Sequence, residues 1–104
     1  TCDFKEGNKV LLSMGANITD LNINFPHTSG NFILLVKQDA TGSRLITNYN
    51  AKDYEGNAAA GGSTLKFAGG SNPTLTTTAN KVDIISIYWD DENEVGYATI
   101  TKNF

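Results

Sequence analysis

Residues Lys81–Trp89, KVDIISIYW, show the most regular alternation of side chains in this sequence. Successive side chains of an extended strand point to opposite faces, so this segment has two faces of different composition. One face holds Val82, Ile84, Ser86 and Tyr88, and the other holds Ile85, Ile87 and Trp89. The acidic turn DDEN and the alternating stretch Val95–Thr101 follow directly. The segment Lys81–Thr101 therefore predicts a β-hairpin.

A second stretch with strand character precedes it. Phe32–Val36 is apolar on both faces, which favours a central strand covered on both sides. The polar turn Gln38–Ser43 follows, with Gly42 placed for a positive φ. Arg44–Thr47 then predicts a returning strand, so we expect a second hairpin over Asn31–Tyr49.

Shorter strand signals fill the rest of the chain. They lie at Lys9–Met14, from Ile18 to Phe25, at Thr64–Phe67 and around Leu75. The stretch Asn48–Ser63 carries no pattern and predicts a long loop, in which the small residues Ala58–Gly62 contribute little burial. About eight short strands between turn signals predict a single all-β domain over residues 1–104. We expect an antiparallel, jelly-roll-like β-sandwich.

Composition supports this class and excludes others. Asn and Thr occur 12 times each and Gly 10 times, which favours pleated strands and tight turns over helices. The net charge of −3 argues against binding to nucleic acid or to an anionic membrane surface. No apolar run approaches the roughly 20 residues of a membrane helix, so we expect no membrane insertion.

The single cysteine, Cys2, cannot form an internal disulfide. We expect a free thiol near the chain end, with a bridge between subunits as the alternative. Cysteine and histidine are too few for a structural zinc site, so no cofactor is predicted.

Catalytic groups are sparse in the sequence. His27 is the only histidine, and its closeness to Ser29 does not make a triad, which also needs a third group to orient the base. The carboxylates cluster in turns, and the most acidic of these is Asp90–Glu94. We interpret that turn as a solvated hairpin tip, with calcium binding as the open alternative. The sequence predicts no enzyme.

Several aromatic residues lie near loops or strand ends and are candidates for contact with a glycan or a partner. Aromatic faces pack on sugar rings, and neighbouring carboxylates bind hydroxyl groups. Packing within the core or between subunits explains the same aromatic residues equally well. The candidates are Tyr49, Tyr54, Tyr88, Trp89 and Tyr97, together with Asp90 and Asp91.

The turn QDATGSR predicts a self-contained structural motif. Asp39 can accept hydrogen bonds from turn amides, Gly42 supplies the left-handed residue, and Arg44 reaches a nearby carboxylate or carbonyl, with Asp83 as a candidate partner. We therefore assign this motif a structural role. Its residues are Gln38, Asp39, Thr41, Gly42, Ser43, Arg44 and Asp83.

The segments FILLVKQDATGSRLI and NKVDIISIYWDD, with an aromatic residue in the last strand, resemble a C-terminal β domain of bacteriophage virion structural proteins. Such domains occur in tail-fibre, capsid-fibre and decoration proteins, and the resemblance covers Asn17 to Phe104. It implies that the chain is the C-terminal part of a longer protein and lies on the surface of the virion. It also implies a homotrimer that contacts other virion proteins and a host surface glycan, without enzyme activity.

Two other classes of function remain open. The first is a carbohydrate-binding module of a secreted bacterial protein, which the oligomeric state and binding of soluble glycans would distinguish from a virion domain. The second is a glycan-cleaving enzyme, which the sequence favours least because no pair of acid and base residues stands out.

Overall fold

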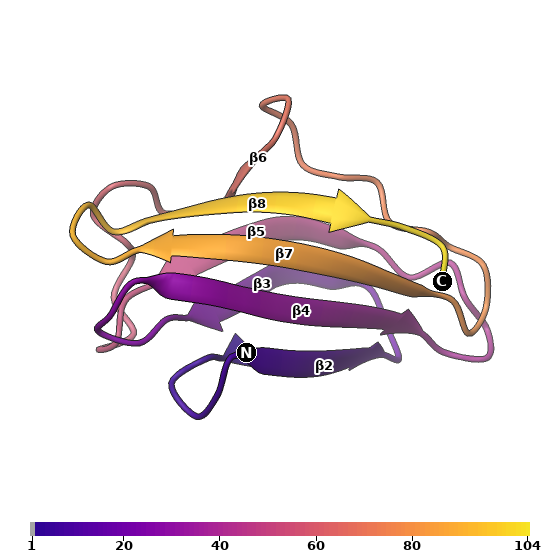
Figure 1. Ribbon diagram of the computed structural model, residues 1–104. Coiled ribbons are helices and arrows are strands. Elements are labelled where there is room, and N and C mark those ends of the chain that lie inside the picture. The colour runs from indigo at the N-terminus through magenta and orange to yellow at the C-terminus, as the bar shows by residue number, and fades with distance from the viewer. Residues whose placement is uncertain (1) are drawn as a thin grey trace.

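A computed structural model describes residues 2–104 of this protein, which form eight strands joined by loops. The strands are β1 (Cys2–Asp3), β2 (Lys9–Met14), β3 (Ile18–Asn24), β4 (Gly30–Gln38), β5 (Ile46–Lys52), β6 (Lys66–Phe67), β7 (Val82–Asp90) and β8 (Val95–Thr101) (Figure 1).

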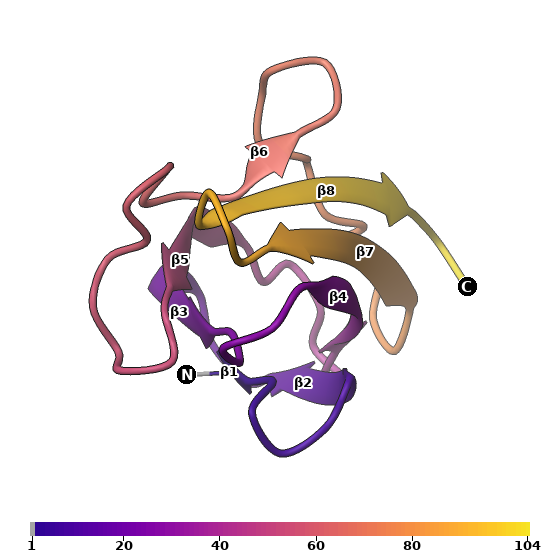
Figure 2. The same cartoon turned by 60° about the vertical axis from the view of Figure 1, so that its left-hand side comes forward.

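The strands form two sheets that face each other across one core (Figure 2). The three-stranded sheet has the order β1-β3-β5, and both of its pairings are parallel. The five-stranded sheet has the order β2-β4-β7-β8-β6. In this sheet β7 pairs antiparallel with both β4 and β8. The two edge strands pair parallel, β2 with β4 and β6 with β8. The fold is therefore all-β, as predicted, but of mixed strand direction.

The parallel pairs follow from the path of the chain. From β1 to β5 each strand lies in the sheet opposite to the strand before it. Since the chain reverses at each of these connections, every second strand runs in the same direction. The crossover that a parallel pair requires is here a single strand of the other sheet. The expectation of uniformly antiparallel strands is wrong for this reason.

The predicted hairpin over Asn31–Tyr49 is also wrong. β4 and β5 belong to different sheets, because the chain crosses the core after the turn at Gln38–Ser43. The central position of β4 is confirmed, since β2 and β7 flank it. Its outer face is only partly covered, with Ile33 and Leu35 half-buried.

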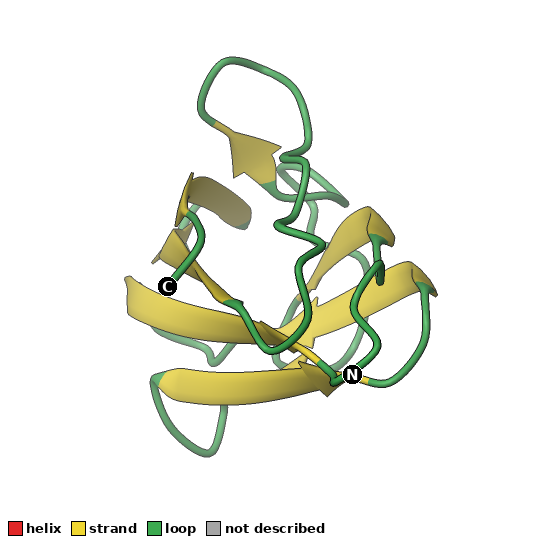
Figure 3. Cartoon of the chain, turned by 90° about the vertical axis from the view of Figure 1, so that its right-hand side faces the viewer, coloured by secondary structure: helices red, strands yellow, loops and turns green. Residues whose placement is uncertain are grey.

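The hairpin over Lys81–Thr101 is confirmed. β7 and β8 are antiparallel, and Tyr88 lies opposite Tyr97 in the register. The strand expected around Leu75 does not form, although Leu75 is buried in a loop beside the sheets. Loops connect all the strands, and residues 2–104 contain no helix (Figure 3).

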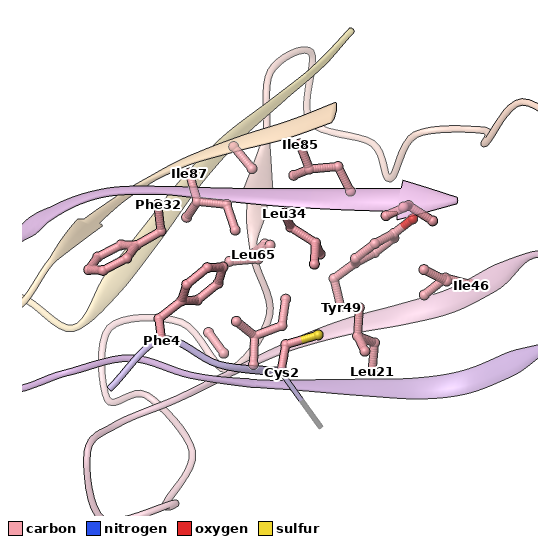
Figure 4. Packing of buried hydrophobic residues seen from close by; sticks show 14 of the residues in the cluster. Cys2, Phe4, Leu21, Phe32, Leu34, Ile46, Tyr49, Leu65, Ile85 and Ile87 are labelled. Carbon is pink, nitrogen blue, oxygen red and sulfur yellow. The ribbon is translucent and has the colours of Figure 1, made fainter. Parts of the chain in front are cut away.

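The hydrophobic core fills the space between the sheets (Figure 4). Leu21 and Ile23 reach it from β3, and Leu34 and Ile85 reach it from the five-stranded sheet. An aromatic cluster closes one end of the core, where Phe25 stacks on Trp89 with ring centroids 4.4 Å apart and an interplanar angle of 3°. Phe4 and Phe32 complete this cluster, with their centroids 5.0 Å apart.

The segment 58–65 covers the outer edge of β5. The Ala51 amide donates to the Ser63 carbonyl at 2.8 Å, and the Leu65 amide donates to the Tyr49 carbonyl at 2.9 Å. Ala59 is buried. The expectation of an unpatterned loop over Asn48–Ser63 with little burial is therefore wrong at both ends, because β5 continues to Lys52 and the following segment packs on it. An exposed strand edge is thereby avoided.

Among residues 2–104 there is no helix long and apolar enough to cross a membrane.

Candidate functional site

The turn after β4 is organised by the carboxylate of Asp39. Its Oδ1 accepts hydrogen bonds from the amides of Thr41 and Gly42, at 3.0 and 2.9 Å. Its Oδ2 accepts from Nη2 and Nε of Arg44, at 3.0 and 3.3 Å. The Arg44 side chain and the Gly42 amide lower the pKa of Asp39 below its ordinary value. The capping role predicted for Asp39 is confirmed.

Gln38 ties this turn to a distant loop. Its side chain is buried, and Nε2 donates to the carbonyls of Arg44 and Thr76 at 2.7 and 3.0 Å. Its Oε1 accepts from the Arg44 amide at 3.0 Å. All partners of the Gln38 side chain are backbone groups. The side chain therefore supplies, at the end of β4, hydrogen bonds that a neighbouring strand would otherwise supply.

Asp83 is the second buried polar residue of this region, and it does not pair with Arg44. Its two carboxylate oxygens accept from the amides of Thr76 and Asn103, at 2.7 and 2.9 Å. The predicted Arg44–Asp83 pair is wrong because Asp39 lies closer to the guanidinium, within the same turn. Asp83 instead holds the loop before β7 and the end of the chain against the start of that strand.

The remaining turn residues complete the connection. Gly42 has φ 75°, as predicted, and Ser43 has φ 60°. The Ser43 amide donates to the Thr77 carbonyl at 2.7 Å. The side chains of Thr41 and Ser43 are exposed. Residues 38–44, 76–83 and 103 thus meet in one hydrogen-bonded joint, which we call the motif joint.

Two of the aromatic candidates for glycan contact are buried. Tyr49 and Trp89 are both 0% exposed, and the Trp89 ring stacks on Phe25 within the core. The expectation that these two side chains contact a glycan is wrong, because each occupies an inward position of its strand. Burial, followed by the charge of Asp83, raises the pKa of the Tyr49 hydroxyl. That hydroxyl has no hydrogen-bond partner among the described residues.

Cys2 is a free cysteine, as predicted, and its side chain is buried. It lies in β1, opposite Ile23 of β3, and burial raises the pKa of its thiol. The alternative of a bridge between subunits is therefore not supported, since a buried and protonated thiol is a poor nucleophile.

The acidic turn Asp90–Glu94 uses its carboxylates for internal hydrogen bonds. Asp90 accepts from Asn93 Nδ2, from the Asn93 amide and from the Glu92 amide, and these hydrogen bonds lower the pKa of Asp90. Glu94 Oε1 accepts from the Ala60 amide at 3.0 Å. Residues 2–104 contain no group of three or more side chains suited to hold a metal ion. The hairpin-tip interpretation fits these contacts better than the calcium alternative.

His27 and Ser29 both contact Asp91 rather than each other. His27 Nδ1 lies 3.1 Å from Asp91 Oδ2, and Ser29 Oγ accepts from the Asp91 amide at 2.8 Å. Tyr54 packs beside His27 with ring centroids 4.3 Å apart and is half-exposed. These contacts join the loops that carry His27, Tyr54 and Asp91.

An open groove of about 690 Å³ lies on the outer face of the five-stranded sheet, over β4, β7, β8 and β6. Tyr88 and Tyr97 line it, with exposed fractions of 46% and 50%. They are directly opposite in the β7–β8 register, and the next outward pair is Ser86 opposite Thr99. The groove brings together two predicted candidates, Tyr88 and Tyr97, and leaves Tyr49, Tyr54 and Trp89 elsewhere.

The sequence-based prediction missed the polar residues of this groove. Ser86 shares the outward face of Lys81–Trp89 with Tyr88, and Thr99 lies two residues from Tyr97. Aligning the two arms of the predicted hairpin would have placed these four side chains together. Asn31 and Lys66 could not have been found in this way, because they come from strands paired over a long distance in the chain.

No protein-family model, no curated protein and no solved structure matches this chain.

Proposed function

We propose that this chain is a non-enzymatic structural domain of a bacteriophage virion protein, of the capsid-fibre, decoration or tail-fibre type. It is displayed on the particle surface and contacts other virion proteins and the host surface. The observation that carries this proposal is the motif joint, in which the two segments that resemble virion proteins meet.

The joint explains why these two segments occur together. Asp39 accepts the hydrogen bond of the Asn80 amide through its carbonyl at 3.0 Å, and the Gln38 amide donates to the Lys81 carbonyl at 3.0 Å. The buried side chains of Gln38 and Asp83 add hydrogen bonds from β4 and β7 to the backbone of Thr76 in the intervening loop. Buried polar groups satisfied in this way specify a particular arrangement of strands. A motif with that task supports a structural role rather than a chemical one.

The finer features of the proposal are a jelly-roll-like sandwich and a homotrimer. The repeated crossing of β1 to β5 between the two sheets supports the sandwich form. The exposed Leu11 on β2, the edge strand of the five-stranded sheet, supports association, because an exposed apolar side chain at a sheet edge favours burial against a partner.

Labelling of purified particles tests the virion assignment. Antibody raised against the purified domain should mark the particles in electron micrographs, and antibody preadsorbed with the domain should not. Detection of the protein only in the culture medium of uninfected bacteria, with unlabelled particles, would contradict the proposal.

The second candidate is a carbohydrate-binding module of a secreted bacterial protein. The groove with Tyr88 and Tyr97 favours it, because exposed aromatic side chains in a groove are suited to pack on sugar rings. Secretion by uninfected bacteria, together with a monomeric mass, would support this candidate over the first.

A further inference from the structure

We infer that the groove lined by Tyr88 and Tyr97 binds an uncharged saccharide chain. The inference rests on the proposed contact with a host surface and names the site and the class of ligand. It concerns a different set of residues from the motif joint.

The first support is the aromatic pair. Tyr88 and Tyr97 are cross-strand neighbours, and such pairs on one face have Cβ atoms about 4.5–5.5 Å apart. Both side chains are about half exposed although they lie at the centre of a sheet rather than in a loop. Two adjacent rings on a rigid hairpin present an apolar platform to the C–H faces of sugar rings.

The second support is the polar set around the platform. The lining includes the hydroxyls of Ser86 and Thr99, the amide of Asn31 and the ammonium of Lys66. Within residues 2–104 the side chains of these four residues form no hydrogen bond or ion pair with the protein. A saccharide supplies hydroxyl groups that both donate and accept, so each of these groups can be satisfied on binding. An apolar partner would bury them without partners, which is unfavourable.

The third support is the balance of charge. Among residues 2–104, Lys66 is the only charged residue that lines the groove. Asp90 is the next residue after Tyr88 on the same face of β7, and the acidic turn Asp90–Glu94 follows it. A cation on one side and carboxylates on the other give no net attraction for a polyanion, which favours an uncharged ligand.

Affinity electrophoresis in native gels tests this inference. The probes are three neutral polysaccharides, namely dextran, mannan and laminarin, and one polyanion, polygalacturonate. We expect at least one neutral polysaccharide to retard the protein. Tyr88→Ala and Tyr97→Ala should each weaken that binding by about tenfold, the equivalent of roughly 1.4 kcal/mol.

Matched variants separate this site from the rest of the surface. Tyr54→Ala removes an aromatic ring of similar exposure that lies in the loop after β5, outside the groove. This variant should leave the affinity for the polysaccharide within about twofold. Lys66→Gln should weaken binding, whereas Lys81→Gln, an exposed lysine at the opposite end of β7, should not. Melting curves of each variant establish that the exposed side chains were removed without unfolding.

Three outcomes overturn the inference. They are no retardation by any of the three neutral polysaccharides, retardation by polygalacturonate alone, and equal affinity in the Tyr88, Tyr97 and Tyr54 variants. A change of oligomeric mass in Tyr88→Ala without polysaccharide binding would assign the face to a second copy of the chain. Particle labelling is independent of all these results, so failure here is distinguishable from failure of the proposed virion role.

Discussion

Gly42 is subject to two separate constraints in the motif joint. Its φ of 75° lies in the left-handed region, and a Cβ atom there would lie 2.5 Å from the Thr77 carbonyl oxygen and 2.9 Å from the Ala79 nitrogen. The turn therefore needs glycine both for its backbone conformation and for the close approach of the loop before β7.

Replacement of Gly42 by alanine should destabilise the fold by about 2–5 kcal/mol. Left-handed backbone costs a non-glycine residue roughly 1–2 kcal/mol, and the overlap with the 77–79 backbone adds about 1–3 kcal/mol. The free energy of unfolding in urea measures the loss.

Gly56→Ala is the matched control for this variant. Gly56 also has a positive φ, of 84°, but no atom lies within 4 Å of its Cβ position. It should lose only the conformational part, about 1–2 kcal/mol. Equal losses in the two variants would show that the loop does not approach Gly42 closely.

The pH dependence of stability should report the pairing of Asp39. Arg44 and the Gly42 amide hold the folded-state pKa of this carboxyl below the ordinary value of about 3.9. The pair therefore contributes its full stability above that value, and the contribution is lost as pH falls through the lower folded-state pKa. Thermal melts of the parent protein should fall with decreasing pH below about pH 4 more steeply than melts of Asp39→Asn.

Comparison of these two curves isolates Asp39 from the other acidic groups. Asp90 also has a lowered pKa, but it is present in both proteins and contributes equally to both curves. Parallel curves would mean that the Asp39–Arg44 ion pair does not persist in solution.

At the scale of the elements, Gly61 connects the segment 58–65 to the turn between β7 and β8. Its amide donates to the Glu94 carbonyl at 3.1 Å, and a Cβ atom there would overlap the Asn93 backbone oxygen. Gly61→Ala should therefore cost about 1–3 kcal/mol by overpacking. Denaturant unfolding followed by tryptophan fluorescence measures it, since Trp89 is close to this turn.

Gly62→Ala provides the comparison within the same segment. The nearest atom to its Cβ position is Lys66 Cε at 3.5 Å, an ordinary contact with a flexible side chain. Its effect should stay within about 0.5 kcal/mol. If both variants unfold like the parent, the segment is not fixed against the β7–β8 turn.

The elements that the sequence predicted well are those determined by residues close together in the chain. Alternation located β2 and the β7–β8 hairpin, and the turn chemistry of Asp39 and Gly42 was correct. The pairing of strands could not be predicted, because residues of β3 meet β5 only after the chain has crossed the other sheet.

The sequence held more information on one candidate residue than the prediction used. Asn48, Asn50 and Lys52 alternate with Tyr49 and Ala51, a strand pattern that places Tyr49 on the buried face. Arg44 was assigned to a distant carboxylate although Asp39, five residues away, lies within its reach.

For the whole molecule, we expect a homotrimer in solution. Leu11 is 60% exposed on β2, which is the edge strand of the five-stranded sheet, and the opposite residue on β4 is Leu35. An apolar edge of this kind favours association. Light scattering should give a mass three times that of the 11.2 kDa chain.

Variants at two exposed leucines locate the interface. Leu11→Ser should shift the mass toward that of the monomer, and Leu45→Ser, at an exposed leucine in the turn before β5, should not. A monomeric parent protein at every concentration would contradict self-association of this chain.

The alternation of the first strands between the two sheets has a consequence for the folding reaction. No neighbouring pair of strands from β1 to β5 can zip up locally, so each contact there requires closure of a long loop, which costs entropy before any pairing is gained. Of the strands in the described part of the chain, only β7 and β8 form a local hairpin. We therefore expect slow, highly cooperative folding that begins at this hairpin, as is typical of chains dominated by non-local contacts. The fragment 2–52 should remain unstructured by circular dichroism when it is made alone, because it holds the three-stranded sheet but only β2 and β4 of the sheet that covers it.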